Sequence, residues 1–145
     1  MSRCRLMRGV CLASAFGLLF VGGMIYLIFR PRNILLNYLL SCLGLDPLLD
    51  GVREWGQSFV LPHWIVYSLP AGLWSISYVL MVHIFSVNHS LRTRLAFTSL
   101  MPCLGVVSEL LQIVGLVPGV FDCQDVLCYA VPYLLYLSIM LFRKH

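Results

Sequence analysis

Four long apolar stretches take up more than half of this chain of 145 residues. They cover residues 10–29, 65–87, 95–117 and 126–142. A helix needs roughly 20 apolar residues to cross a hydrocarbon core of about 30 Å. The only acidic, basic or imidazole side chains inside the stretches are His83 and Glu109. The pattern therefore predicts four transmembrane helices, the last of them at the short limit of the range.

The composition excludes a soluble globular domain. Hydrophobic residues make up 60% of the chain and charged residues only 11%, whereas charged residues average about 25% in soluble proteins. So much apolar surface also excludes intrinsic disorder. The net charge is +4, but the basic residues lie in short clusters at the ends of the apolar stretches. This distribution argues against nucleic acid as a partner and makes the lipid bilayer the expected one.

The cysteines predict no metal site and no cofactor. They form no Cys-x-x-Cys motif and no Cys/His pair at zinc spacing, and most are expected to fill space within helices. The six are Cys4, Cys11, Cys42, Cys103, Cys123 and Cys128.

The basic residues beside the apolar stretches predict the orientation of the chain in the membrane. One side carries seven, namely Arg3, Arg5, Arg8, Arg92, Arg94, Arg143 and Lys144. The other side carries Arg30, Arg32 and Arg53, diluted by Asp46, Asp50, Glu54, Asp122 and Asp125. Both termini are therefore predicted to be cytoplasmic. A cleaved signal peptide at Ala13-Ser14-Ala15 is the alternative for the first stretch, but a retained anchor fits the continuing apolar run better.

Residues 30–64 are too many for a simple connection. Asp46 is predicted to cap a helix that has Pro47 at its first position. One face of this helix is apolar and the other polar, as shown by Leu48, Val52, Trp55 and Phe59 against Asp50, Arg53, Glu54 and Gln57. We expect an amphipathic helix on the outer membrane surface or over the mouth of the bundle, and a solvated connector with one apolar side is an equal alternative. The predicted fold is a single all-α membrane domain, a four-transmembrane-helix bundle with this outer amphipathic segment.

Glu109 is the acidic residue inside a predicted span. A charged side chain in mid-membrane costs about 2.5–3.5 kcal/mol, so an intramembrane acid is a functional candidate. With the cytoplasmic end at Leu95, a rise of about 1.5 Å per residue places Glu109 in the outer third of the membrane. Gly105, Glu109 and Gln112 share one helix face, which should turn into the bundle.

More polar residues are expected near Glu109. Pro118-Gly119 predicts a turn, after which Asp122 and Asp125 open the last helix; capping is the favoured role of Asp122 and is compatible with ligand binding. Tyr129, Tyr133 and Tyr136 follow Asp125 on one face, where their hydroxyls can satisfy a buried carboxylate; the alternative is that they are ordinary anchors at the membrane interface. For Ser75 on the second span, close helix packing is the favoured role. The candidate ligand-binding residues are Glu109, Gln112, Asp122, Asp125, Tyr129 and Ser75.

Three segments in order resemble the VanZ-like family of small bacterial membrane proteins. They are Ser108-Glu109-Leu110-Leu111-Gln112, Pro118-Gly119-Val120-Phe121-Asp122 and Asp125-Val126-Leu127. Leu69-Pro70-Ala71-Gly72-Leu73-Trp74 resembles the start of the family's preceding span, so that the resemblance covers about half the chain. Departures indicate a divergent branch: no arginine follows the Pro-Gly turn, Tyr129 stands in place of an asparagine, and Ala71 in place of a frequent aspartate.

The resemblance implies a multi-pass protein of the bacterial cytoplasmic membrane, in a family whose founding member is associated with resistance to teicoplanin. We expect it to bind a lipid-linked or other envelope ligand at a polar site near the outer face. One alternative is a membrane-embedded hydrolase or transferase that uses Glu109 and Asp125 as an acid/base pair. Another is a structural helper subunit in which these residues only fix helix packing.

Overall fold

The computed structural model describes residues 2–30 and 40–142, and over these residues it is helical without a β-strand. Four helices are long and apolar enough to cross a membrane, in agreement with the sequence. They are α1 (Ser2–Phe29), α5 (Leu69–Ser86), α6 (Leu91–Ile113) and α7 (Cys123–Phe142). Two shorter helices, α3 (Asp46–Gln57) and α4 (His63–Tyr67), lie between α1 and α5 in the sequence.

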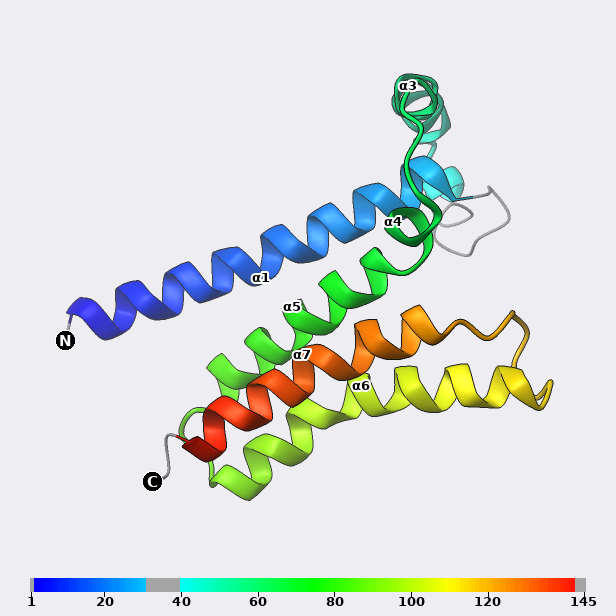
Figure 1. Ribbon diagram of the computed structural model, residues 1–145. Coiled ribbons are helices and arrows are strands. Elements are labelled where there is room, and N and C mark those ends of the chain that lie inside the picture. Colours follow the sequence, from blue (N-terminus) through cyan, green and yellow to red (C-terminus); the bar gives the residue numbers. More distant parts are fainter. Residues whose placement is uncertain (1, 31–39, 143–145) are drawn as a thin grey trace.

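The long helices alternate in direction, and α5 lies in the middle (Figure 1). It packs against α1 on one side and against α6 and α7 on the other. The start of α1, the turn between α5 and α6 and the end of α7 lie together at one end, which we call the basic end (Figure 1). The end of α1, α4 and the connection from α6 to α7 lie at the opposite end, which we call the α4 end.

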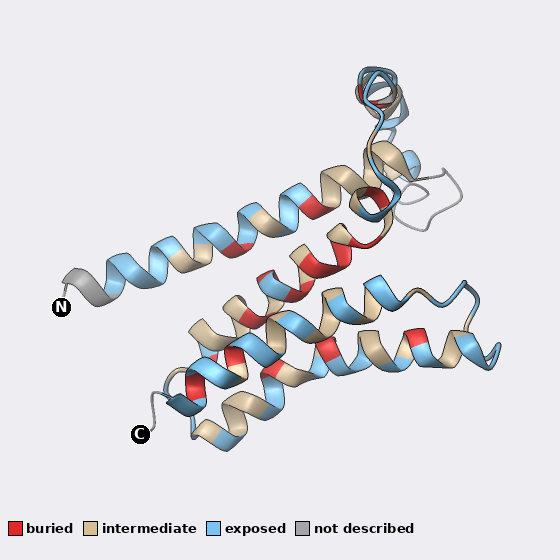
Figure 2. Cartoon of the chain, viewed as in Figure 1, coloured by how far each residue is buried: buried red, intermediate tan, exposed pale blue. Residues whose placement is uncertain are grey.

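Small residues let α5 approach its neighbours closely, and Figure 2 shows that burial concentrates on this helix. The fully buried hydroxyl of Ser77 donates a hydrogen bond of 2.7 Å to Ala15 O of α1. Ser75 Oγ donates one of 3.2 Å to Tyr129 O of α7. Small side chains and hydrogen bonds between helices are the usual means by which apolar helices associate when the hydrophobic effect does not drive them together.

The second and third predicted stretches do not form helices over their full length. The second stretch is divided at Ser68 into α4 and α5, and Pro70 lies in the first turn of α5, where its missing N–H costs no hydrogen bond. The third stretch ends as a helix at Ile113, because the backbone turns at Gly115, which has a φ of 71°.

Helix α3 crosses the direction of the long helices, since Figure 1 views it along its axis while α1 lies in the plane of the picture. The predicted capping role of Asp46 is wrong. The helix begins at Asp46 itself, and the Asp46 carboxylate accepts a hydrogen bond of 2.6 Å from Ser41 Oγ.

Arg53 was predicted on the polar face of α3 but is buried against the end of α1. Its Nε donates to Leu27 O at 2.8 Å, and its Nη2 donates to Arg30 O at 2.7 Å. These bonds satisfy carbonyl groups that the end of a helix otherwise leaves without a partner. A side chain on α3 therefore holds the last turn of α1 in place.

The neighbouring glycines Gly22 and Gly23 give a matched test of the packing between α1 and α5. A Cβ atom added at Gly22 would lie 2.7 Å from Trp74 Nε1, whereas one added at Gly23 would meet no atom within 4 Å. We predict that Gly22→Ala lowers the free energy of unfolding by about 1–3 kcal/mol through overpacking. Gly23→Ala should leave it unchanged or raise it, because alanine favours a helix. Unfolding in detergent, followed by circular dichroism, measures both, and equal losses would contradict the packing described.

Candidate functional site

A cavity of about 660 Å³ opens at the α4 end of the molecule. The end of α1, α4, the start of α5, the end of α6 and the start of α7 all contribute to its lining. Ligand sites in proteins commonly have volumes of about 300–1,000 Å³, so the cavity is large enough for a small molecule or a headgroup. Five of the six candidates lie in its wall, namely Glu109, Gln112, Asp122, Asp125 and Tyr129.

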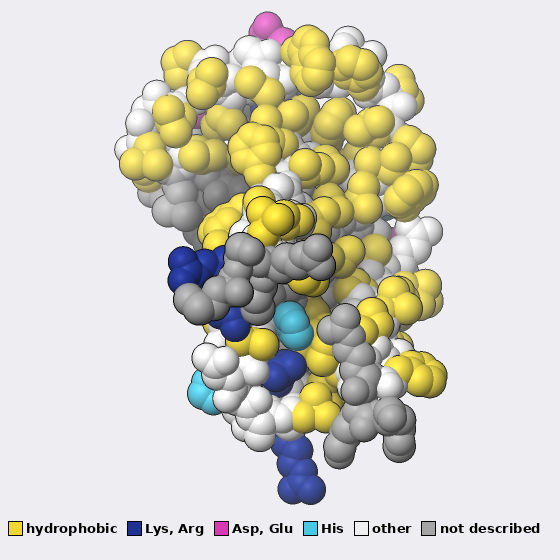
Figure 3. Space-filling view, turned by 90° about the vertical axis from the view of Figure 1, so that its left-hand side faces the viewer, with side chains coloured by type: hydrophobic (Ala, Val, Ile, Leu, Met, Phe, Trp, Pro, Cys, Tyr) yellow, Lys and Arg dark blue, Asp and Glu magenta, His cyan; other side chains and the backbone are white. Residues whose placement is uncertain are grey.

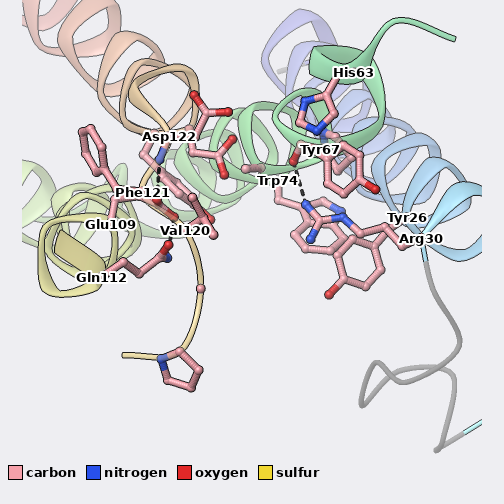
Figure 4. A pocket seen from close by; sticks show the side chains of 16 residues that line it. Tyr26, Arg30, His63, Tyr67, Trp74, Glu109, Gln112, Val120, Phe121 and Asp122 are labelled. Atoms are coloured by element: carbon pink, nitrogen blue, oxygen red, sulfur yellow. Dashed lines mark hydrogen bonds between the residues drawn. The ribbon is translucent and has the colours of Figure 1, made fainter. Parts of the chain in front are cut away.

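Glu109 is the most deeply buried acid of the cavity, with 6% of its surface exposed. Its Oε1 accepts a hydrogen bond of 3.1 Å from Gln112 Nε2, and its Oε2 accepts a longer one of 3.5 Å from the backbone N–H of Asp122 (Figure 4). Gly105 on the same face lies against the ring of Tyr129, where an added Cβ would come within 2.5 Å. The shared face predicted for Gly105, Glu109 and Gln112 does turn toward α7.

Asp122 and Asp125 both line the cavity at the start of α7. Asp122 Oδ1 accepts a hydrogen bond of 2.8 Å from the backbone N–H of Gln124, which confirms the predicted capping role. Asp125 differs, because its Oδ1 is buried and has no hydrogen-bond partner among the described residues. A buried carboxylate oxygen in this state requires a donor from elsewhere.

Ser75 does not line the cavity, and its hydroxyl instead supports the backbone of Tyr129. The predicted role of the following tyrosines as partners of a carboxylate is wrong. Tyr133 donates to Leu95 O at 3.3 Å, and the Tyr136 hydroxyl pairs with His83 Nδ1 at 3.0 Å. These hydroxyls join helices further along the bundle.

The opposite wall of the cavity is aromatic and cationic, and the sequence did not reveal it. The guanidinium carbon of Arg30 lies 4.9 Å from the ring centres of both Tyr26 and Tyr67. Arg30 Nη2 donates a hydrogen bond of 2.7 Å to Tyr67 O, while its Nε is buried without a partner among the described residues. His63 stacks on Tyr67 with ring centres 4.1 Å apart, and Trp74 also lines the cavity. The sequence signal for this wall is the spacing of Tyr26 and Arg30, which are four residues apart.

The two walls face each other across the cavity, with Arg30, Tyr26 and Tyr67 on one side and Glu109 and Asp122 on the other (Figure 4). The one hydrogen bond that the Arg30 side chain donates within the described chain goes to a backbone carbonyl group and not to a carboxylate. The cavity therefore presents an anion-binding side and a side that accepts hydrogen bonds from a cation. No group of three or more His, Cys, Asp or Glu side chains in the described part of the chain is placed to hold a metal ion.

A scan of protein-family models and searches of curated proteins and of solved structures all return no match to this chain. Its chemistry is therefore argued from the cavity itself.

Two glycines of the connection from α6 to α7 give a matched test of the cavity wall. Gly115 has a φ of 71° and open space around it, whereas Gly119 has a φ of 146° and an added Cβ there would lie 2.7 Å from Gln112 Oε1. Asparagine tolerates the first conformation but not the second. We predict that Gly119→Asn lowers the free energy of unfolding by about 1–3 kcal/mol, while Gly115→Asn changes it by less than about 0.5 kcal/mol.

Thermal unfolding of the two purified variants in the same detergent makes this comparison. A larger loss for Gly115→Asn than for Gly119→Asn would contradict the described course of the connection.

Proposed function

We propose that the protein is a multi-pass protein of the bacterial cytoplasmic membrane that binds the polar part of an envelope amphiphile, either a lipid or a lipid-linked precursor. The observation that carries the proposal is a cavity lined by charges of both signs at one end of four apolar helices. A headgroup site in such a place is reached directly from the surface of the membrane.

The exposed surface of the long helices supports insertion in a bilayer. Large apolar side chains point away from the protein along these helices, among them Phe20, Leu104 and Leu135. Soluble monomers rarely expose a contiguous apolar patch of more than a few hundred Å². Figure 3 shows that hydrophobic side chains dominate the surface even where the molecule is viewed from the basic end. Acyl chains would cover this surface.

The distribution of charge supports an outward-facing cavity. The first turns of α1 and α6 carry Arg5, Arg8, Arg92 and Arg94, and Lys and Arg side chains gather at the basic end in Figure 3. The positive-inside rule places such an end in the cytoplasm. The cavity then lies near the outer face, as the sequence predicted for Glu109.

Helix α3 supports a membrane interface at the α4 end. Leu48 and Trp55 are exposed on it, and the Trp55 ring packs with its centre 5.0 Å from that of Phe59, which follows the helix. A helix that crosses the spans and exposes aromatic side chains suits the interface between headgroups and acyl chains. We propose that α3 lies in the outer interface, beside the mouth of the cavity.

Binding accounts for the cavity better than a structural helper role. Side chains that only fix helix packing should fill the space between the helices, yet Arg30, Glu109 and Asp125 line a cavity of about 660 Å³. A hydrolase or transferase that uses Glu109 and Asp125 stays a hypothesis, and both residues line the cavity. The VanZ-like resemblance also stays a prediction.

The proposal predicts that Glu109→Gln and Asp125→Asn lose co-purifying lipid. Each variant, and the exposed control Glu54→Gln, is purified in a mild detergent, and bound lipids are quantified by mass spectrometry beside the melting temperature. We expect a loss of at least about tenfold in the retained lipid for the cavity variants, since each removes an acceptor for a desolvated donor. The control should retain the lipid content of the wild type.

Two outcomes would overturn the proposal. Equal loss of thermal stability in both cavity variants, with the bound lipid unchanged, would establish the helper role. Turnover of an added envelope lipid that both variants abolish would establish an enzyme.

A further inference from the structure

The charged residues of the cavity also indicate which charged groups the headgroup of the ligand carries. Three carboxyl groups, those of Glu109, Asp122 and Asp125, line the cavity together with one guanidinium group, that of Arg30. Glu109 and Asp122 lie across the cavity from Arg30 (Figure 4). Within the described chain, the hydrogen bonds to Glu109 come from an amide side chain and a backbone N–H, both neutral. Buried ionised groups are retained when an opposite charge with good hydrogen bonds compensates their desolvation. A bound molecule that fits this cavity therefore carries a cation with N–H donors.

The opposite wall selects an anion. Arg30 is held between the rings of Tyr26 and Tyr67 and directs its guanidinium group at the cavity. The planar guanidinium group matches the geometry of phosphate and carboxylate oxygens.

The aromatic residues distinguish between kinds of cation. A quaternary ammonium group has no N–H donor and is usually bound on the faces of aromatic rings. The Tyr26 and Tyr67 rings here already hold Arg30. A primary ammonium group instead offers three N–H donors, which suit the oxygens of Asp125, Glu109 and Asp122. The cavity thus favours a primary over a quaternary amine.

We infer that the ligand is a zwitterion of the phosphoethanolamine type, with its phosphate at Arg30 and its primary ammonium group at Glu109 and Asp125. This inference rests on the proposed function, because it names the headgroup of the amphiphile. A diacyl lipid and a water-soluble phosphoethanolamine carry the same chemistry, and the experiment separates them.

Trp74 serves as the reporter of the cavity. The chain has three tryptophans, of which Trp55 and Trp64 are exposed and Trp74 lines the cavity. In the full chain carrying Trp55→Phe and Trp64→Phe, all tryptophan fluorescence comes from Trp74. The protein in detergent micelles is titrated with dioleoyl-phosphatidylethanolamine, -phosphatidylcholine and -phosphatidylglycerol, and separately with soluble phosphoethanolamine.

We expect phosphatidylethanolamine to change the Trp74 emission saturably, with an affinity at least about tenfold above those of the other two lipids. Glu109→Gln and Asp125→Asn should remove the preference for phosphatidylethanolamine over phosphatidylglycerol. Arg30→Gln should lower the affinity for all three lipids. Glu54→Gln and Arg92→Gln, exposed charges outside the cavity, are the controls. If a cavity variant does not fold, the three lipids can still be compared in the chain that carries only Trp55→Phe and Trp64→Phe.

The remaining outcomes test the headgroup assignment separately from the binding of an amphiphile. Equal affinities for the three lipids would overturn the headgroup assignment and leave amphiphile binding in place. Binding of soluble phosphoethanolamine as tight as that of the lipid would support the zwitterion and overturn the amphiphile. No response of Trp74 to any probe would overturn both.

Discussion

The burial of Glu109 between α6 and α7 is the constraint on which the rest of the site depends. A carboxyl group with 6% of its surface exposed needs fixed donors, and the chain supplies the Gln112 amide and the Asp122 backbone. The Gln112 donor lies three residues further along α6, whereas the Asp122 donor requires the connection from α6 to α7 to fold back over the end of α6. Gly119 permits this course with a φ of 146° and leaves room for the Gln112 amide. The acidic wall is thus built from local backbone geometry.

The cationic wall depends instead on the packing of α1 on α5. Trp74 of α5 lies against Gly22, donates a hydrogen bond of 3.3 Å to Leu19 O and packs its ring 5.2 Å from that of Tyr26. These contacts fix the position of α1 along the length of α5. Arg53 of α3 then donates hydrogen bonds to the carbonyl groups at the end of α1. Arg30 is carried to the mouth of the cavity as a result, so that α3 supports the site without lining it.

The sequence predicted the parts of this arrangement that follow from local pattern. Four apolar helices follow from hydropathy, and the shared face of Gly105, Glu109 and Gln112 follows from helical spacing. Arg30 was identified only as a loop charge, because its place across the cavity from the α6–α7 connection depends on contacts between segments far apart in the chain. Arg53 was assigned to the polar face of α3 for the same reason: an amphipathic pattern does not reveal a long side chain that reaches a helix end. Ser75 was correctly expected to serve helix packing. Spacing alone did not show that its hydroxyl donates a hydrogen bond to the backbone carbonyl group of Tyr129.

Helix α4 and the α6–α7 connection face each other across one cavity. A nitroxide label at position 63, introduced by His63→Cys in a full chain whose native cysteines are replaced, tests this by paramagnetic broadening of amide resonances in detergent. His63 is exposed at the rim and lines the cavity, so the label fits there. We expect strong broadening for residues 120–125 and none for residues 88–92 at the basic end. Full intensity at residues 120–125 would contradict this arrangement, because the two walls would then belong to separate surfaces.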